Sequence, residues 1–164
     1  MKAVTNPLER PKEKTIAASR VTLTQLMLPE HANAHGNVHG GNLMKMADEA
    51  GGICAMRHAQ RPSVTVAMDD MTFYSPVHVG ELVCCVASVN WIGKTSMEIG
   101  VKVTAENPIT GQVTHTNSAY LVYVALDDAG RPCSVPGLVL ESDEERRRWQ
   151  EAEERQELRL RRRR

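Results

Sequence analysis

The residues best suited to chemistry gather in one segment, HGNVHGG at positions 35–41, and Asp48 follows shortly afterwards. A glycine-rich loop that leads into a helix presents free backbone N–H groups and the positive end of the helix dipole. Such an end can hold a phosphate group or stabilise a carbonyl oxygen that becomes negative during attack. A P-loop is excluded because no Gly-Lys-Ser/Thr follows the glycines. The amides of residues 38–41 are therefore candidate donors to an oxyanion.

Residues 40–58 are predicted to form the helix that carries Asp48. Gly51 and Gly52 interrupt it, and each costs about 1 kcal/mol relative to alanine. They follow Asp48 by three and four residues, so they leave its face of the helix without side chains. We therefore expect another backbone or a ligand to approach that face closely. The opposite face is an apolar stripe with helical period, formed by Leu43, Met46, Ala47, Ala50 and Cys54.

The position of Asp48 along this helix limits how it can cooperate with the loop. Asp48 lies about eight residues into the helix, roughly 12 Å from its start at a rise of about 1.5 Å per residue. Asn37 and Asp48 of one chain therefore cannot both contact one reacting atom. If they cooperate, each site takes Asn37 from one subunit and Asp48 from another, and two-fold pairing makes two equivalent sites.

Five stretches with β-branched or alternating apolar residues are predicted as strands. Short turns between consecutive stretches favour antiparallel pairing, with the last four strands as a meander. We therefore expect an α+β fold in which an antiparallel sheet of about five strands wraps around one long central helix. The predicted strands cover residues 20–28, 63–74, 81–91, 95–106 and 113–126.

Two polar segments flank the predicted domain at residues 18–138. Residues 1–17 are polar and contain two prolines, as is typical of a flexible lead-in. Residues 139–164 are almost wholly charged, and we expect this tail to be helical or disordered. Its main interpretation is a solvated helix, and the alternative is an oligomer or anionic-partner contact through Arg159 and the cluster Arg161–Arg164.

The overall composition excludes several classes of protein. Twenty basic and twenty acidic side chains give a formal net charge of zero, so nothing predicts a nucleic-acid or membrane partner. The spacing of the four cysteines fits neither a disulfide framework nor a zinc site. No stretch approaches about 18 apolar residues, and the first residues lack the apolar run of a signal peptide. We expect a cytoplasmic protein with reduced thiols.

Four blocks in order, HGNVHGGNLMKMADEAGG, VTVAMDDMTFYSPVHVGELV, GKTSMEIGVKV and YVALDDAGRPCSVP, give a specific resemblance. Over about residues 18–138 the chain resembles the acyl-CoA thioesterase branch of the hotdog superfamily. In that family a loop asparagine and an aspartate on the central helix of the opposing hotdog unit form the thioesterase centre. The resemblance places these roles on Asn37 and Asp48. Both lie on a single domain here, as in unfused, self-associating members.

The resemblance implies hydrolysis of acyl-CoA thioesters to free carboxylic acid and CoA. Asp48 would activate a water or attack the thioester directly, and these two roles stay open. Asn37 would orient the water or the carbonyl, with the Gly40 and Gly41 amides at the oxyanion. The CoA thiolate is a reasonable leaving group, so no metal or other cofactor is expected. A homo-oligomer is implied, built from dimers and, as a trimer of dimers, hexameric.

The resemblance also implies a set of residues that contact CoA. In the family, the region after Gly93 lies by the pantetheine and the phosphates, and a cation with two hydroxyls suits phosphate contact. Arg57 equally suits a partner of the helix C-terminus. The pair Val135-Pro136 is placed only by its position after the last strand. The full set is His39, Arg57, Lys94, Thr95, Ser96, Val135 and Pro136.

Other chemistries remain to be weighed against hydrolysis. His31, His35 and His39 recur every four residues, but the glycines between them argue against a helix that would align them for a metal. A hotdog dehydratase or hydratase would pair His39 with Asp48 or Glu49. A third alternative is a catalytically silent hotdog that binds acyl-CoA as a regulatory module.

Overall fold

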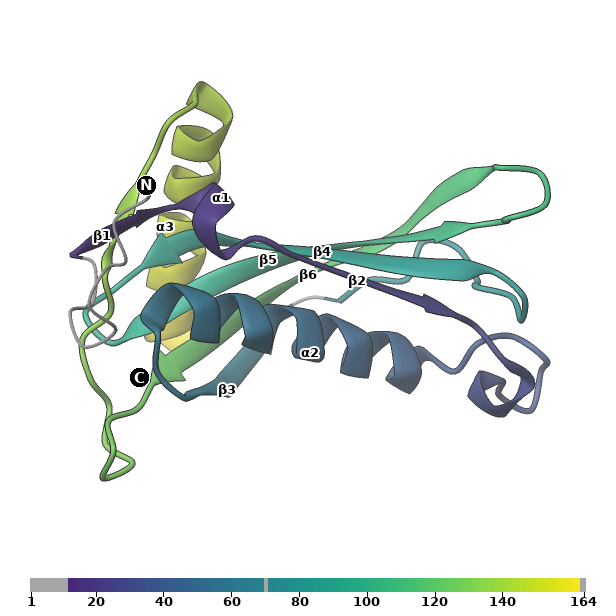
Figure 1. Ribbon diagram of the computed structural model, residues 1–164, viewed down its shortest axis with the longest axis horizontal. Coiled ribbons are helices and arrows are strands. Elements are labelled where there is room, and N and C mark those ends of the chain that lie inside the picture. Colours follow the sequence, from purple (N-terminus) through teal and green to yellow (C-terminus); the bar gives the residue numbers. More distant parts are fainter. Residues whose placement is uncertain (1–11, 70, 163–164) are drawn as a thin grey trace, which may run out of the picture.

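The computed structural model describes residues 12–69 and 71–162. Most of the predicted lead-in, residues 1–11, and the end of the arginine cluster, residues 163–164, lie outside this range. One five-stranded antiparallel sheet lies over the helix α2 (Gly40–Ala59), as Figure 1 shows. The α+β architecture predicted from the sequence is confirmed. The strands of this sheet are β2 (Val21–Leu26), β3 (Ser63–Asp69), β4 (Leu82–Ile92), β5 (Ser96–Glu106) and β6 (Val113–Ala125).

The central helix forms where the apolar period predicts it. The His39 ring caps its N-terminus by accepting from the Gly41 amide, and Gln60 ends it in the left-handed region at φ 51°. Its apolar face packs mainly against β4, β5 and β6, where burying each Leu or Met contributes about 1.5–3 kcal/mol. All members of the predicted stripe are buried, namely Leu43, Met46, Ala47, Ala50 and Cys54.

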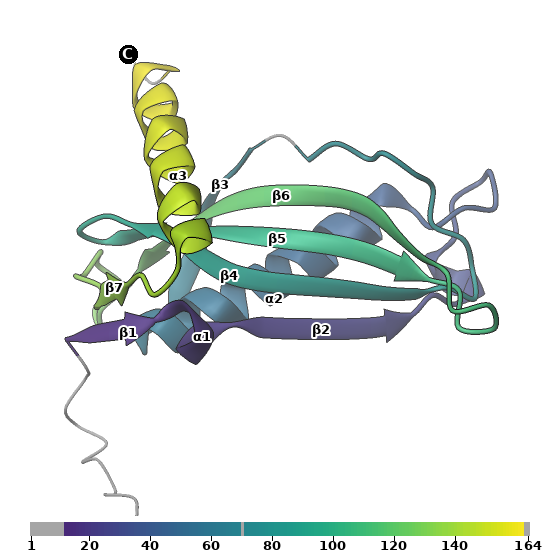
Figure 2. The same cartoon turned by 90° about the horizontal axis from the view of Figure 1, so that it is seen from above.

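The strand order is β2-β4-β5-β6-β3, so the predicted four-strand meander is wrong at its first strand. Strand β3 pairs with β6, in a register that places Asp69 opposite Tyr120, and not with β4. The reason is the connection between Asp69 and Leu82, which is far longer than the roughly two to five residues of a hairpin loop. It carries the chain from the edge strand β3 to β4, which lies beyond β6 and β5 in the sheet (Figure 2). Strands β2 and β3 are the edges.

Part of the predicted flexible lead-in is structured. Residues Glu13–Thr15 form the short strand β1, which pairs in parallel with β7 (Gly137–Val139). The helix α1 (Ile16–Ser19) follows, and a 3-10 turn, η1 (Pro29–His31), comes after β2. The lead-in prediction is therefore wrong for these residues, because β7 supplies a pairing partner more than a hundred residues away.

The charged tail forms the helix α3 (Asp143–Arg162) on the face of the sheet opposite α2 (Figure 2). It does not simply extend into solvent. Arg155 and Arg159 both form ion pairs with Glu98 of β5, whose side chain is fully buried. Arg159 also pairs with Asp69 at the end of β3. Long-range ion pairs therefore dock a helix that has almost no apolar face.

The remaining features concern thiols, metals and membranes. All four cysteines are unpaired. Within residues 12–69 and 71–162, no group of three or more His, Cys, Asp or Glu side chains is arranged to hold a metal ion. None of the helices in the described part of the chain has the length and apolar character needed to cross a membrane.

Candidate active site

Asp48 lies half-buried in the middle of α2, where two strands supply partners for its carboxylate. The Thr65 hydroxyl of β3 donates to Oδ1 of Asp48 at 2.7 Å. The Tyr123 hydroxyl of β6 lies 3.0 Å from the same Oδ1 and 3.0 Å from the Asp48 carbonyl oxygen. A carboxylate oriented in this way suits a general base or a nucleophile.

Within one subunit, the bare face beside Asp48 is filled by a side chain, that of Tyr123. A Cβ added at Gly51 would lie 2.4 Å from the Tyr123 hydroxyl oxygen, and one at Gly52 would lie 3.7 Å from the ring. The phenol needs both the space and a polar partner, because a buried hydroxyl without a hydrogen bond is costly. The glycines admit Tyr123 to Asp48.

The loop before α2 forms a separate cavity of about 240 Å³ at the start of the helix. Asn33, Asn37 and Gly40 line it, together with aromatic residues that follow β3, while Asp48 does not. One subunit therefore does not bring Asn37 and Asp48 together, as the length of the helix predicts. Its lining is Asn33, Asn37, Val38, Gly40, Leu43, Phe73, Tyr74, Ser75, Pro76 and Val77.

The four amides considered as oxyanion donors are not equally free. Those of Val38 and His39 donate to backbone carbonyls at 2.8 Å each. The Gly41 amide donates to Nδ1 of His39 at 2.9 Å, so capping the helix removes Gly41 from the candidate donors. Among the hydrogen bonds of the described residues, none uses the Gly40 amide, and Gly40 also lines the cavity. Gly40 is the remaining donor.

Sequence reasoning did not single out Asn33, Thr65 or Tyr123. Oδ1 of Asn33 accepts from the amides of His35 at 2.9 Å and Asn37 at 3.3 Å, which fixes its carboxamide. Its NH₂ group has no acceptor within the described part of the chain and can donate to a carbonyl. Its place in a loop rich in Asn and Gly was a signal for this kind of turn. Thr65 gave none, because its contact with Asp48 depends on how strand and helix pack.

The predicted CoA-binding residues do not form one site within a subunit. Nη1 of Arg57 donates to the Arg20 carbonyl at 2.9 Å, which ties the end of α2 to the start of β2. The turn after β4 and the segment after β6 meet near that end, while His39 lies at the opposite end of α2. The Lys94 carbonyl accepts from the Val135 amide, and the Pro136 carbonyl oxygen lies 3.0 Å from Nε2 of His58. Thr95 and Ser96 line a cavity of about 210 Å³.

Curated relatives align with this chain over most of its length. The chain is 35% identical over 147 residues to protein VdlD of Helicobacter pylori, covering 90% of this chain and 84% of that protein. It is 37% identical to the uncharacterized acyl-CoA thioester hydrolase YkhA of Bacillus subtilis, with 84% and 80% coverage. It is 33% identical to the cytosolic acyl coenzyme A thioester hydrolase of Rattus norvegicus, with coverage of 90% of this chain and 39% of that protein.

Solved structures agree with these relatives. A hexameric acyl-CoA thioesterase superposes with a TM-score of 0.89 at 34% identity, covering 92% of this chain and 97% of that one. An acyl-CoA hydrolase of Staphylococcus aureus, solved with butyryl coenzyme A and coenzyme A, gives 0.86 at 34% identity, with 92% of each chain covered.

Alanine variants of the S. aureus enzyme have also been solved. Solved variants replace one aspartate, one threonine or one asparagine by alanine. The asparagine precedes the aspartate, and the threonine follows it, by the same numbers of residues that separate Asn33, Asp48 and Thr65 here.

The model of the thioesterase superfamily matches residues 35–123, more than half of the chain. This match covers the loop, the central helix and most of the sheet. Together with the named hydrolases and their structures, it confirms the family that the sequence blocks indicate. The chain belongs to the thioesterase superfamily, in its branch of hotdog acyl-CoA hydrolases.

Proposed function

We propose that the protein hydrolyses acyl-CoA thioesters to a carboxylic acid and CoA, as a homo-oligomer with sites shared between subunits. The observation that carries this proposal is the Asp48 carboxylate, which the Thr65 hydroxyl orients at 2.7 Å in a chain of this family. The names of the relatives and the complex of the S. aureus hydrolase with butyryl coenzyme A support an acyl-CoA substrate.

In the general-base form of the reaction, Asp48 takes a proton from a water whose oxygen attacks the thioester carbonyl carbon. The carbonyl oxygen becomes negative in the tetrahedral intermediate, where the Gly40 amide and the positive start of the α2 dipole of the other subunit stabilise it. The C–S bond then breaks, and the departing CoA sulfur takes the proton. In the nucleophilic form, an Asp48 oxygen attacks the thioester carbon, the C–S bond breaks and CoA leaves as its thiolate. Water then hydrolyses the mixed anhydride, which frees the acid and Asp48, and a proton from that water goes to the CoA thiolate. Both forms use the same oriented carboxylate.

The asparagine comes from a second subunit, because the loop cavity and Asp48 are separate within one chain. The open edge strand β3 supports such pairing: Val64 and Val66 are 44% and 45% exposed, and they flank Thr65. Apolar edge strands of this kind pair with another copy or aggregate. A dimer joined at β3 brings a neighbour close to Asp48, and the hexameric relative supports a further step to a trimer of dimers.

The proposed roles predict a clear order of effects on thiol release from acyl-CoA substrates. Asp48→Asn removes the base or nucleophile while keeping the shape, and we expect a loss of at least about a hundredfold. Asn33→Ala should lower kcat more than Asn37→Ala, because the spacing match favours Asn33. Both variants must first be shown to keep the oligomeric state of the wild type. Wild-type protein that binds CoA esters but releases no thiol would support the silent regulatory module instead.

Sharing of sites has its own experiment. Inactive Asp48→Asn and Asn33→Ala subunits are mixed under conditions in which labelled subunits exchange. Sites that combine the intact Asn33 of one subunit with the intact Asp48 of the other should then recover activity. If exchange is complete and no activity returns, each site belongs to one subunit.

The dehydratase alternative relies on His39, and the structure gives that side chain a different role. Its Nδ1 accepts from the Gly41 amide and caps α2. We also propose a cytoplasmic location, supported by the rat relative named as cytosolic and by four unpaired cysteines. We propose no metal, no other cofactor, and no nucleic-acid or membrane partner. Loss of activity on treatment with a chelator would contradict the first of these.

A further inference from the structure

The two oxygens of the Asp48 carboxylate are held unequally. We propose that this makes Oδ2 the oxygen that reacts, with Tyr123 as a positioning residue that fixes Oδ1. This inference rests on the proposed function and concerns the same site. It assigns an atom and a residue that the resemblance to known thioesterases does not supply.

Both donors to the carboxylate converge on Oδ1. Thr65 lies 2.7 Å and Tyr123 lies 3.0 Å from that atom, while no hydrogen bond among the described residues uses Oδ2. A carboxylate oxygen accepts about two hydrogen bonds, so two hydroxyls fill Oδ1. A water or a thioester carbon therefore meets Oδ2, the oxygen whose lone pairs are free.

The phenol has one proton and two acceptors within 3.0 Å, the Asp48 carbonyl and Oδ1. The carbonyl already accepts the helical N–H of Gly52, and a charged carboxylate is the stronger acceptor. Burial, followed by the charge of Asp48, raises the pKa of Tyr123 above its ordinary value. The hydroxyl therefore stays protonated and donates to Oδ1.

The ring cannot move away from this position. Tyr123 is 1% exposed, and its hydroxyl oxygen would lie 2.4 Å from a Cβ at Gly51. The chain places glycine at this position although glycine inside a helix costs about 1 kcal/mol. The glycines thus preserve a slot that presents a fixed donor to the carboxylate, which is the preorganisation that catalysis requires.

Tyr123→Phe tests the proposal, because it removes only the hydroxyl. We expect kcat to fall about ten- to hundredfold with little change in KM, since one hydrogen bond to a charged group is lost. The acidic limb of the pH profile of kcat/KM should move to higher pH, because the charged carboxylate loses a donor. Tyr120→Phe, on the outer face of the sheet beneath Arg155, is the matched control and should leave kcat unchanged.

Gly51→Ala provides a second variant that keeps the hydroxyl but displaces it. We expect kcat to fall while KM and the melting temperature change less. If both variants retain the wild-type kcat and pH profile, Tyr123 does not position Asp48, although the proposed function stands. If Asp48→Asn is fully active, Asp48 is neither the base nor the nucleophile. The proposed function is then contradicted whatever the role of Tyr123.

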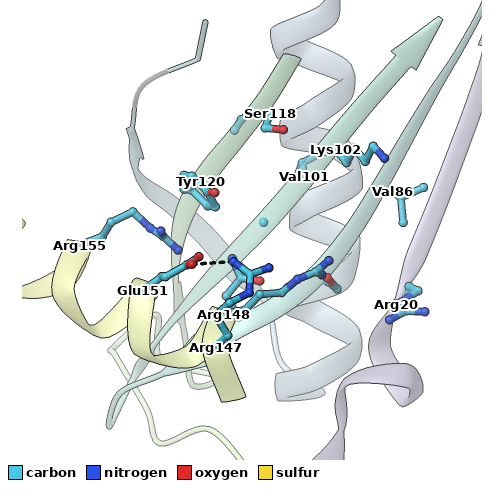
Figure 3. Close-up of a pocket in the computed structure, with 14 residues that line it drawn as sticks. Arg20, Val86, Val101, Lys102, Ser118, Tyr120, Arg147, Arg148, Glu151 and Arg155 are labelled. Atoms are coloured by element: carbon cyan, nitrogen blue, oxygen red, sulfur yellow. Dashed lines mark hydrogen bonds and ion pairs between the residues drawn. The ribbon is translucent and has the colours of Figure 1, made fainter. Parts of the chain in front are cut away.

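A different feature, on the outer face of the sheet, carries a second inference. A cavity of about 410 Å³ lies between α3 and strands β4 to β6 (Figure 3). Its floor is a trough of small and polar side chains, where Ser88 is paired across the strands with Gly100, and Lys102 with Ser118. The volume falls within the range of about 300–1,000 Å³ that is typical of small-molecule sites.

Basic groups dominate the walls of this cavity. Three arginines of α3 face it, and each already has an acidic partner: Arg147 with Glu151 at 2.6 Å, Arg148 with Glu144 at 2.5 Å, and Arg155 with Glu98 at 2.6 Å. Arg20 and Lys102, on the far side of the cavity in Figure 3, have no acidic partner within 4.0 Å in the described residues.

We infer that this cavity binds a small anion that carries phosphate groups. Lys102 and Arg20 provide the charge that the protein itself leaves unmatched, and the Ser88 and Ser118 hydroxyls can donate to phosphate oxygens. The site lies on the face opposite α2 and is therefore distinct from Asp48. Its ligand is either a free polyphosphate or a nucleotide-like molecule, which present the same chemistry.

Calorimetric titration of the intact oligomer with tripolyphosphate tests the inference, and ATP and CoA serve as parallel probes that identify the source of the phosphate. We expect Lys102→Gln to weaken tripolyphosphate binding about tenfold, the loss expected for one charge-assisted contact. Lys45→Gln, an exposed lysine of α2 that pairs with Glu49, is the matched control and should not weaken it. Absence of binding by both tripolyphosphate and ATP would overturn the inference, and so would tripolyphosphate binding by Lys102→Gln and Arg20→Gln that is as tight as that of the wild type.

Discussion

Two helices of 20 residues each lie on opposite faces of one sheet, yet they are held in different ways. The inner helix α2 buries a continuous apolar stripe and has nine buried residues, whereas α3 has one, Ala152. The outer helix is docked by Arg155 and Arg159, which reach the fully buried Glu98. Because apolar packing holds α2 and ion pairing holds α3, we expect substitutions on the two faces of the sheet to change the stability by different amounts.

The difference makes α2 the better element to carry the proposed catalytic group. A closely packed apolar face fixes the rotation of a helix about its own axis. Asp48 is therefore held at hydrogen-bond distance from Thr65 and Tyr123. Ion pairs made through long arginine side chains hold a helix less exactly. The outer helix suits a covering role, and the inner helix suits a role that depends on tenths of an ångström.

The largest expected effect breaks the docking of α3. Glu98→Ala leaves two arginines, 22% and 11% exposed, without their common partner. Removing one member of a buried ion pair costs about 3–5 kcal/mol, and we expect a loss of this size in the free energy of unfolding. Urea denaturation measures it. Thiol release by the remaining folded protein should be unchanged, and a selective loss of kcat would show that α3 also supports the site.

A matched pair of substitutions compares the packing of the two helices. Ala50 of α2 and Ala152 of α3 are both fully buried. Ala50→Leu should destabilise the protein by about 1–3 kcal/mol, because the core between helix and sheet is closed on all sides. Ala152→Leu should lower the free energy of unfolding by less, because α3 packs against the sheet on one side only and can shift outward. Equal losses in chemical denaturation would contradict the difference between the helices.

The sequence predicted α2 and the separation of Asp48 from the loop well, because both depend on local patterns. The apolar period set the helix and its buried face, and helix length separated Asp48 from the loop. The pairing of β3 with β6 and the approach of Tyr123 to Gly51 could not be predicted, since both join residues that are far apart in the chain.

The same limit applied to the outer face. Strand alternation placed Glu98 opposite the apolar side chains of β5, which is where it lies. The pattern could not show that α3 covers this face and that Glu98 is fully buried beneath it. Asn37 was proposed from a motif and stays a prediction, and the hydrogen bonds that fix the Asn33 carboxamide become visible only when the loop is folded.

The C-terminal end of α2 predicts a dependence of stability on pH. Burial lowers the pKa of His58 below its ordinary value of 6.5, while its Nε2 lies 3.0 Å from the Pro136 carbonyl oxygen. Below pH 6.5 the unfolded chain binds a proton that the folded protein resists, so stability is present above this pH and falls as the pH drops towards the lowered pKa. Denaturation midpoints between pH 7 and pH 5 should fall less steeply in His58→Gln. Identical slopes would show that other groups cause the acid sensitivity.

The smallest expected effect concerns the exposed ion pairs of α3. Arg147 and Glu151 lie 2.6 Å apart, but their side chains are 59% and 42% exposed. Solvent screens such pairs, so a double-mutant cycle with alanine should give a coupling of about 0.3–0.5 kcal/mol that shrinks at high salt. The coupling of Arg155 with Glu98 should be several times larger and should respond less to salt, because Glu98 is buried. Similar values for the two cycles would mean that α3 is held by its charges in general, and that burial of Glu98 adds nothing to its docking.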